Sequence, residues 1–162
     1  MASTTSFAVF HHDDCAKHNV SKHPEQPARV TVTLDLLRKE NASRVFKEAP
    51  LATSDQLALF HTQRLLDTNA NIFSKFQKKG AKPFAIDGDT VAMEFTEAAA
   101  LRAAGAVIAA VDFVYGGQRS GDSAAVAVAS SEELGNKSAF CCVRPPRPPC
   151  RNLDAHGLLF LQ

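Results

Sequence analysis

The stretch TEAAALRAAGAVIAAVDFVY, residues 96–115, decides how this chain folds. Its many alanines and the spacing of Leu101, Gly105 and Ile108 are typical of a long helix that packs closely against its neighbours. A pair of glycines ends this helix, and a small, polar stretch follows. The chain then continues as SAFCCV, residues 138–143, which is typical of a buried strand. A long apolar helix followed by a buried strand favours an α/β fold with parallel strands.

Strands and helices also alternate upstream of residue 96. The apolar run SFAVF at residues 6–10 predicts a first buried strand, and the polar residues 11–24 predict a long loop. Pro27 fits the first turn of a helix, because its missing N–H costs nothing there. The sequence then predicts the following features: a helix to about Glu40, a helix capped by Thr53 or Ser54, an amphipathic helix at residues 63–78 and a turn at residues 87–90.

Composition excludes several classes of protein. The formal net charge is +1 and the charged fraction is 22%, without a long basic or acidic block. This charge pattern gives no reason to expect nucleic acid or an anionic membrane as a partner. We see no apolar run that approaches the roughly 20 residues needed to span a bilayer. The four cysteines are too few and too irregular for a disulfide scaffold, so we expect a reducing compartment, cytoplasmic or nuclear.

Three segments together resemble the histone deacetylase and acetylpolyamine amidohydrolase superfamily. They are HPEQPAR at residues 23–29, DGDT at residues 87–90 with the alanine-rich helix after it, and AFCCVRPP at residues 139–146. The resemblance implies part of a three-layer α/β domain of the arginase and deacetylase type, with a mostly parallel sheet. It also implies a zinc-dependent hydrolase that removes acetyl groups from acetylated lysine in proteins or from acetylated polyamines.

The sequence departs from this family just after Pro146. In the family, Arg-Pro-Pro continues as Gly-His-His-Ala, whose histidines are a general acid/base pair. Here the chain continues as RPPC, residues 147–150. If these residues are encoded CGG CCA CCA TGC, loss of the first C leaves codons for Gly-His-His and the start of an alanine codon. We therefore interpret residues 1–146 as the N-terminal part of the domain and residues 147–162 as an out-of-frame tail.

The family's catalytic and metal-binding residues follow the His-His pair. Its zinc ligands are an Asp-x-His pair and a later aspartate, and a downstream tyrosine holds the oxyanion. The one tyrosine of this chain, Tyr115, precedes that point. No catalytic residue, metal ligand or cofactor can therefore be assigned to this chain by resemblance. We expect a truncated deacetylase-family protein without activity.

The resemblance suggests a role for only three residues. It places Arg29 beside an internal cavity, where a guanidinium could meet the departing acetate. The alternative is an arginine that pairs with a carboxylate at a helix start. Asp87 and Asp89 fall in a loop that reaches the substrate rim in the family, whereas a plain capped turn explains the same residues.

Other patterns carry a weaker chemical signal. The histidines and acids of HHDDC, residues 11–15, with His18 and His23, fit no common zinc spacing, so we interpret them as a polar loop. Cys141 and Cys142 should point to opposite faces of a strand and serve as small core residues. His61 is expected at a helix boundary.

Two alternative functions belong to other classes. The segment from Pro146 to Arg151 matches PxxPxR, a pattern that could dock as a polyproline II ligand and would make the chain an interaction module. A regulatory pseudo-enzyme would instead require a stably folded fragment. Because an interrupted sheet exposes an open edge and uncovered apolar surface, we expect the chain to self-associate.

Overall fold

The computed structural model describes residues 6–21, 26–40, 44–77, 81–86, 90–115 and 137–144. Within these residues, a sheet of three strands has the order β2-β1-β5. The central strand β1 (Ser6–His11) pairs in parallel with both β2 (Val45–Glu48) and β5 (Lys137–Cys141). The parallel sheet predicted from the sequence is confirmed.

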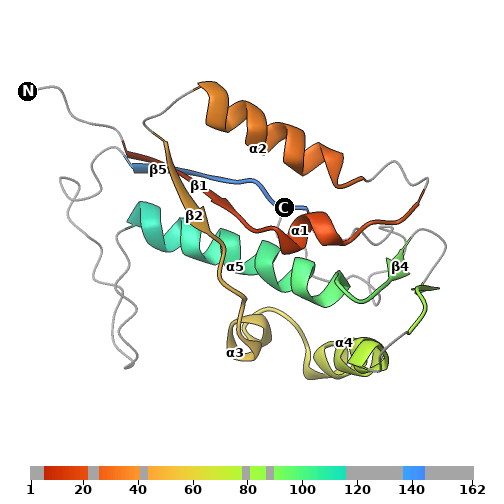
Figure 1. The fold of residues 1–162 in the computed structure, drawn as a ribbon. Helices are drawn as coiled ribbons and strands as arrows, with labels where there is room; N and C mark the ends of the chain where they lie inside the picture. The colour runs from red at the N-terminus through yellow and green to blue at the C-terminus, as the bar shows by residue number, and fades with distance from the viewer. Residues whose placement is uncertain are drawn as a thin grey trace, which may run out of the picture.

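Helices cover both faces of this sheet (Figure 1). Alternate residues of a strand point to opposite faces. Ala8 and Phe10 of β1 therefore form one core cluster with Ala106 and Ala110 of α5 (Thr96–Tyr115). Val9 instead packs with residues of α2 (Ala28–Glu40). The result is a three-layer α/β arrangement, as predicted.

The close packing predicted for the long helix is confirmed at Gly105. A Cβ on Gly105 would overlap the backbone carbonyl of Pro50, in the segment that follows β2. One turn earlier, the carbonyl oxygen of Leu101 accepts a hydrogen bond from the N–H of Ala52 over 3.0 Å. Only glycine allows the backbones of α5 and this segment to approach so closely.

The remaining elements lie around the three layers. They are α1 (Asp14–Lys17), α3 (Ser54–Ala58), α4 (Gln63–Ser74), the short 3-10 helix η1 (Lys75–Gln77), and the strands β3 (Phe84–Ala85) and β4 (Val91–Ala92). Thr53 caps α3, and its side chain and that of Gln56 form a reciprocal capping box. β3 and β4 pair antiparallel on either side of the predicted turn.

Three sequence predictions need correction. Residues 11–24 were predicted as a loop, but α1 forms there and buries Cys15 completely. The strand β2 was not predicted, because four residues with a mixed pattern carry little periodic signal. The amphipathic helix predicted to residue 78 ends at Ser74, where the chain tightens into η1.

The helix α5 corrects the expectation that no apolar run approaches membrane-spanning length. Among the described residues, α5 is long and apolar enough, by length and composition only, to cross a bilayer. The core helix of a globular domain can have the same length and composition. In this structure, the small residues of α5 pack on β1 and β5, as expected for a core helix.

Candidate functional site

The sheet topology singles out one edge of the molecule. The chain leaves β1, adds β2 on one side and later adds β5 on the other side. The connections therefore diverge at the carboxyl ends of β1 and β5. In open α/β sheets, ligands bind in the crevice outside the carboxyl ends of strands at such a switch point. The residues directly after these two strands are the candidate site.

Asp14 is the centre of an ionic cluster just after β1. Its Oδ1 accepts a hydrogen bond from Lys17 Nζ over 2.7 Å, and its Oδ2 accepts one from Arg102 Nε over 3.3 Å. The hydrogen bond from Lys17, more than any other interaction, holds the pKa of Asp14 below its ordinary value. Arg102 also donates from Nη1 to the carbonyl oxygen of Ala49 over 2.7 Å. These bonds tie α1, α5 and the end of β2 together.

His18 belongs to a buried polar chain beside this cluster. Its Nδ1 lies 3.0 Å from Oγ1 of Thr96, and both side chains are almost entirely buried. The Thr96 Oγ1 accepts a hydrogen bond from the N–H of Met93 over 2.8 Å, which leaves its own hydrogen able to donate to His18. These contacts give His18 a structural role at the start of α5.

Arg144 joins the end of β5 to the segment after β1. The Arg144 side chain is buried, and its Nη1 donates to the carbonyl oxygen of His18 over 2.7 Å. Burial raises the pKa of the Cys15 thiol, while a hydrogen bond from the Arg144 backbone opposes this effect. These contacts hold Arg144, the last described residue after β5, at the switch point.

The described residues do not form a zinc site. No group of three or more His, Cys, Asp or Glu side chains in the described part of the chain could hold a metal ion. His18 contacts Thr96, and Asp14 is engaged by Lys17 and Arg102. Nδ1 of His11 is buried without a partner, and burial lowers the pKa of this histidine. A catalytic zinc needs about three protein ligands, so no step of zinc chemistry follows from these residues.

Cys141, the last residue of β5, and Cys142, which follows it, lie as predicted. Cys141 Sγ is 3.5 Å from the carbonyl oxygen of Ala106 in α5, whereas Cys142 Sγ is 3.8 Å from that of Val30 in α2. Their side chains therefore point to opposite faces of the sheet. Burial raises the pKa of Cys142 to about 11. Both thiols are core groups in this structure.

Of the three residues suggested by resemblance, the structure describes only Arg29. Arg29 is exposed in the first turn of α2, and its cavity role stays a prediction. Asp87, Asp89, His23 and the PxxPxR segment from Pro146 to Arg151 lie outside the described residues. His61 lies between α3 and α4, at a helix boundary as predicted.

Sequence reasoning missed the cluster around Asp14 and Arg102. One signal could have indicated it. Arg102 is the one charged residue between Glu97 and Asp112 in an otherwise apolar helix. An arginine among residues that pack on a sheet needs a buried acceptor. Nothing in the sequence, however, shows that this acceptor is Asp14.

Comparisons with known proteins agree with this architecture. The crystal structure of the HDA15 HD domain superposes with a TM-score of 0.63 at 21% sequence identity. The match covers 88% of this chain and 36% of that one, so the chain spans about a third of the solved domain. At this identity the likeness shows the fold, and a search of curated proteins found no match. The family model of the histone deacetylase domain matches residues 23–158, and the chain therefore belongs to the histone deacetylase domain family.

Proposed function

We propose that this chain supplies the N-terminal part of a zinc-dependent deacetylase domain. The observation that carries the proposal is the position of Arg144 at the carboxyl end of β5, beside the segment after β1. In the family, the histidine pair and then the metal ligands follow this strand. The intact domain would hydrolyse the amide of an acetylated lysine or an acetylated polyamine.

The catalytic part of such a domain is proposed to begin after Pro146 in another reading frame. If residues 147–150 are encoded CGG CCA CCA TGC, removal of the first C gives codons for Gly-His-His and the start of an alanine codon. The match to the family model covers residues 23–158 and so includes residues 147–158, which this proposal places out of frame. Sequencing of genomic DNA and transcript across the codons for residues 144–151 tests whether the reading frame shifts by one nucleotide there. A surplus C supports the shift, and an unchanged sequence in both refutes it.

The chain as it stands is proposed to lack deacetylase activity. Zinc-dependent amide hydrolysis uses a polarising ion, an activated water and a proton donor, and the described residues include no group of three or more His, Cys, Asp or Glu side chains that could hold such an ion. The test uses the full chain with added zinc, an acetyl-lysine peptide and an acetylated polyamine. A chain re-encoded as Gly-His-His-Ala and extended in that frame is the positive control. Turnover by the present chain above the zinc blank would refute the proposal.

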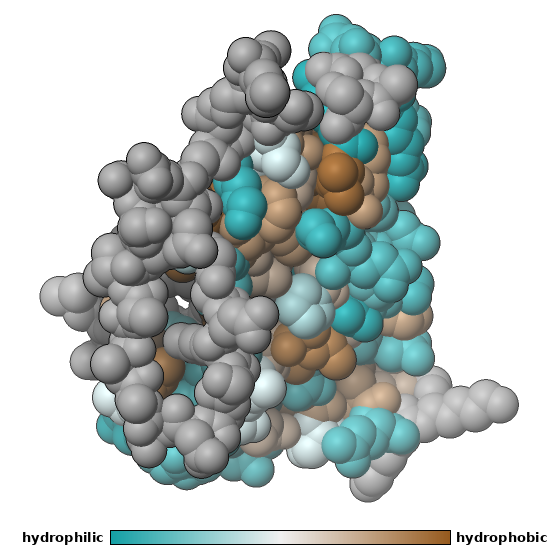
Figure 2. All heavy atoms as spheres, turned by 90° about the vertical axis from the view of Figure 1, so that its left-hand side faces the viewer, coloured by the Kyte–Doolittle hydropathy of each residue, from teal (hydrophilic) through white to brown (hydrophobic). Residues whose placement is uncertain are grey.

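The chain is also proposed to self-associate. Val45 on β2 and Phe140 on β5 are both more than two-fifths exposed, and within the described residues each of these strands pairs only with β1. Val111 and Tyr115 are exposed near the end of α5. Figure 2, which faces the side where α5 ends, shows apolar side chains between hydrophilic ones. Open strand edges and exposed apolar groups favour association. A cytoplasmic or nuclear location remains the proposal from the cysteine pattern.

A further inference from the structure

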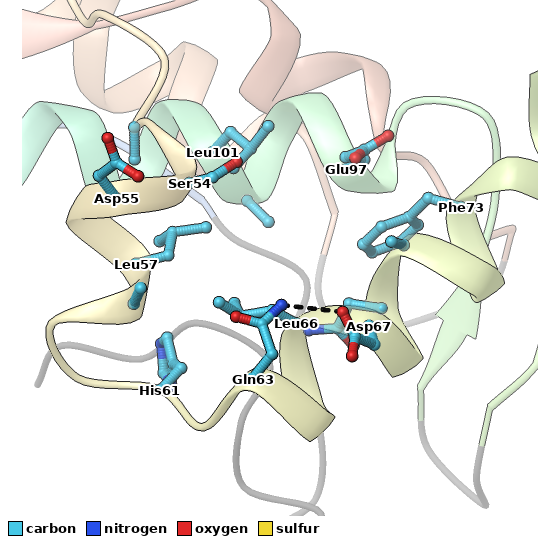
Figure 3. Close-up of a pocket in the computed structure, with 15 residues that line it drawn as sticks. Ser54, Asp55, Leu57, His61, Gln63, Leu66, Asp67, Phe73, Glu97 and Leu101 are labelled. Atoms are coloured by element: carbon cyan, nitrogen blue, oxygen red, sulfur yellow. Dashed lines mark hydrogen bonds between the residues drawn. The ribbon is translucent and has the colours of Figure 1, made fainter.

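A cavity lies away from the candidate site, between helices α3, α4 and α5. Its volume is about 390 Å³. Thr96 contacts His18, while the next residue of α5, Glu97, lines the cavity. Figure 3 shows Glu97 and Phe73 on one side of this hollow and Asp55 and Leu57 on the other. A space of this size can hold a small organic molecule.

The lining combines an apolar wall with negative charge. Leu57, Leu66, Phe73 and Leu101 form much of the wall. Among the described residues that line the cavity, three carry a carboxylate: Asp55, Asp67 and Glu97. None of these described lining residues is a lysine or arginine. Asp67 accepts a hydrogen bond from Gln63 over 2.9 Å and retains further acceptor capacity. Burial lowers the pKa of His61, so this lining histidine adds little positive charge at neutral pH.

A smaller hollow of about 110 Å³ shares two of these residues. Phe73 and Glu97 line both hollows, and the smaller one adds Phe76 and Glu94. The space around Glu97 is therefore acidic and bordered by aromatic rings. The face of an aromatic ring attracts a cation. Burial raises the pKa of Glu97, and a bound cation would offset that cost by stabilising the carboxylate.

Asn69 points independently to a ligand. It lines the larger cavity and is only 9% exposed. No hydrogen bond from its side-chain amide to another described residue is seen, and the amide is not among the polar atoms that are fully closed off from solvent. The amide therefore keeps access to the cavity that Asn69 lines and retains its hydrogen-bonding capacity there. A ligand that donates a hydrogen bond to its oxygen would use this capacity.

We propose that this cavity binds a primary organic ammonium ion with a short apolar body. The hydrocarbon part would lie against Leu57, Leu66 and Leu101, and the ammonium group would lie toward the carboxylates and Asn69. The three carboxylates, which belong to exposed residues, disfavour an anion, and a neutral alcohol would leave their negative charge uncompensated. The inference does not depend on deacetylase chemistry, because it uses no residue of the candidate site.

The test is equilibrium dialysis of the full chain against radiolabelled hexylammonium, with hexanol as the neutral control of similar shape. Dialysis reports bound ligand whether or not the chain self-associates. We expect hexylammonium to bind at least about fivefold more tightly than hexanol, because each exposed ion pair adds up to about 1 kcal/mol. Equal binding of the two molecules, or no binding of hexylammonium, would overturn the proposal.

Variants connect binding to this cavity. Glu97→Gln and Asp67→Asn should each weaken hexylammonium binding about threefold, whereas Asp112→Asn, on α5 outside the lining, should leave it unchanged. Asn69→Leu removes the amide and should weaken binding while the far-UV circular dichroism stays the same. Ala70→Leu fills part of the cavity and should abolish binding, with Asn71→Leu as the matched control on α4. Unchanged binding in Glu97→Gln and Ala70→Leu would place the amine elsewhere and refute the assignment.

Discussion

Arg102 and Asp14 lie 88 residues apart in the sequence, and the Nε of Arg102 donates to Oδ2 of Asp14 over 3.3 Å. The same guanidinium donates from Nη1 to the carbonyl oxygen of Ala49. One side chain of the core helix therefore holds both the segment after β1 and the segment after β2. Arg102 thus shapes the carboxyl edge of the sheet, after which the family's catalytic residues would follow. No catalytic role is assigned to Arg102 itself.

Replacing Arg102 should destabilise the fold. Arg102→Ala leaves the carbonyl of Ala49 without this donor and removes one partner of Asp14. Loss of hydrogen bonds to a partly buried charged group costs about 2–3 kcal/mol. Urea unfolding at a fixed protein concentration measures the change. Arg64→Ala, at an exposed position of α4, is the control and should cost less than about 0.5 kcal/mol. Equal losses in both variants would contradict the role given to Arg102.

Gly105→Ala separates packing from helix propensity. Alanine favours a helix over glycine by about 1 kcal/mol, so propensity alone predicts a more stable protein. The added Cβ would meet the carbonyl oxygen of Pro50, and overpacking of this kind costs about 1–3 kcal/mol. We expect a net loss of stability in thermal unfolding. A variant that melts at a higher temperature than the parent would show that the helix and this segment can separate freely.

The stability of the chain should fall in acid through Asp14. Its folded pKa lies below the ordinary 3.8, chiefly because of the hydrogen bond from Lys17. The unfolded chain therefore takes up this proton first as the pH falls. The stabilisation is fully present above the unfolded pKa and is lost as the pH falls through the folded pKa. Urea unfolding between pH 6 and pH 3 should show a flatter acid limb for Asp14→Asn. Asp35→Asn, exposed on α2, should retain the parent's slope. A parent-like slope in Asp14→Asn would argue against this linkage.

Cys142 should resist alkylation in the folded chain. Its pKa of about 11 arises mainly from burial. At pH 8 the thiolate fraction, and with it the rate of reaction with iodoacetamide, should fall about a hundredfold relative to an ordinary cysteine. Peptide mass spectrometry after timed labelling measures each site, and the urea-unfolded chain is the control. Labelling of Cys142 at the same rate in both states would show that β5 is not packed under α2.

A charge on the β5 edge should reduce self-association. Phe140 is 42% exposed on this outer strand. Lysine on an open edge disfavours pairing with another chain, so Phe140→Lys should sediment as a smaller species than the parent. Leu59→Lys removes an even more exposed apolar side chain, in the turn after α3, and should leave the sedimentation profile unchanged. Identical profiles for all three proteins would place the association surface elsewhere.

The sequence alone identifies the elements that carry long, regular patterns. The apolar period of residues 96–115 matches α5, and the apolar runs near residues 6 and 138 match β1 and β5. Local signals also place Pro27 directly before α2 and Thr53 as the cap of α3. Each of these features depends on residues within one or two turns of each other. Such signals can be read without knowing the rest of the fold.

Short elements and polar clusters were decided by the tertiary structure. The strand β2 has four residues, and its partner is β1. The helix α1 has four residues and is held by Arg102, from α5, through Asp14. Asn69 lies in a polar stretch of sequence, yet in the folded chain it is buried beside a cavity that residues of α3 and α5 also line. The sequence by itself determined the long helices and the apolar strands that build the layers, because helix and strand periods are local. The carboxyl edge and the cavity required the folded chain, because their contacts join residues whose separation in sequence carries no local signal.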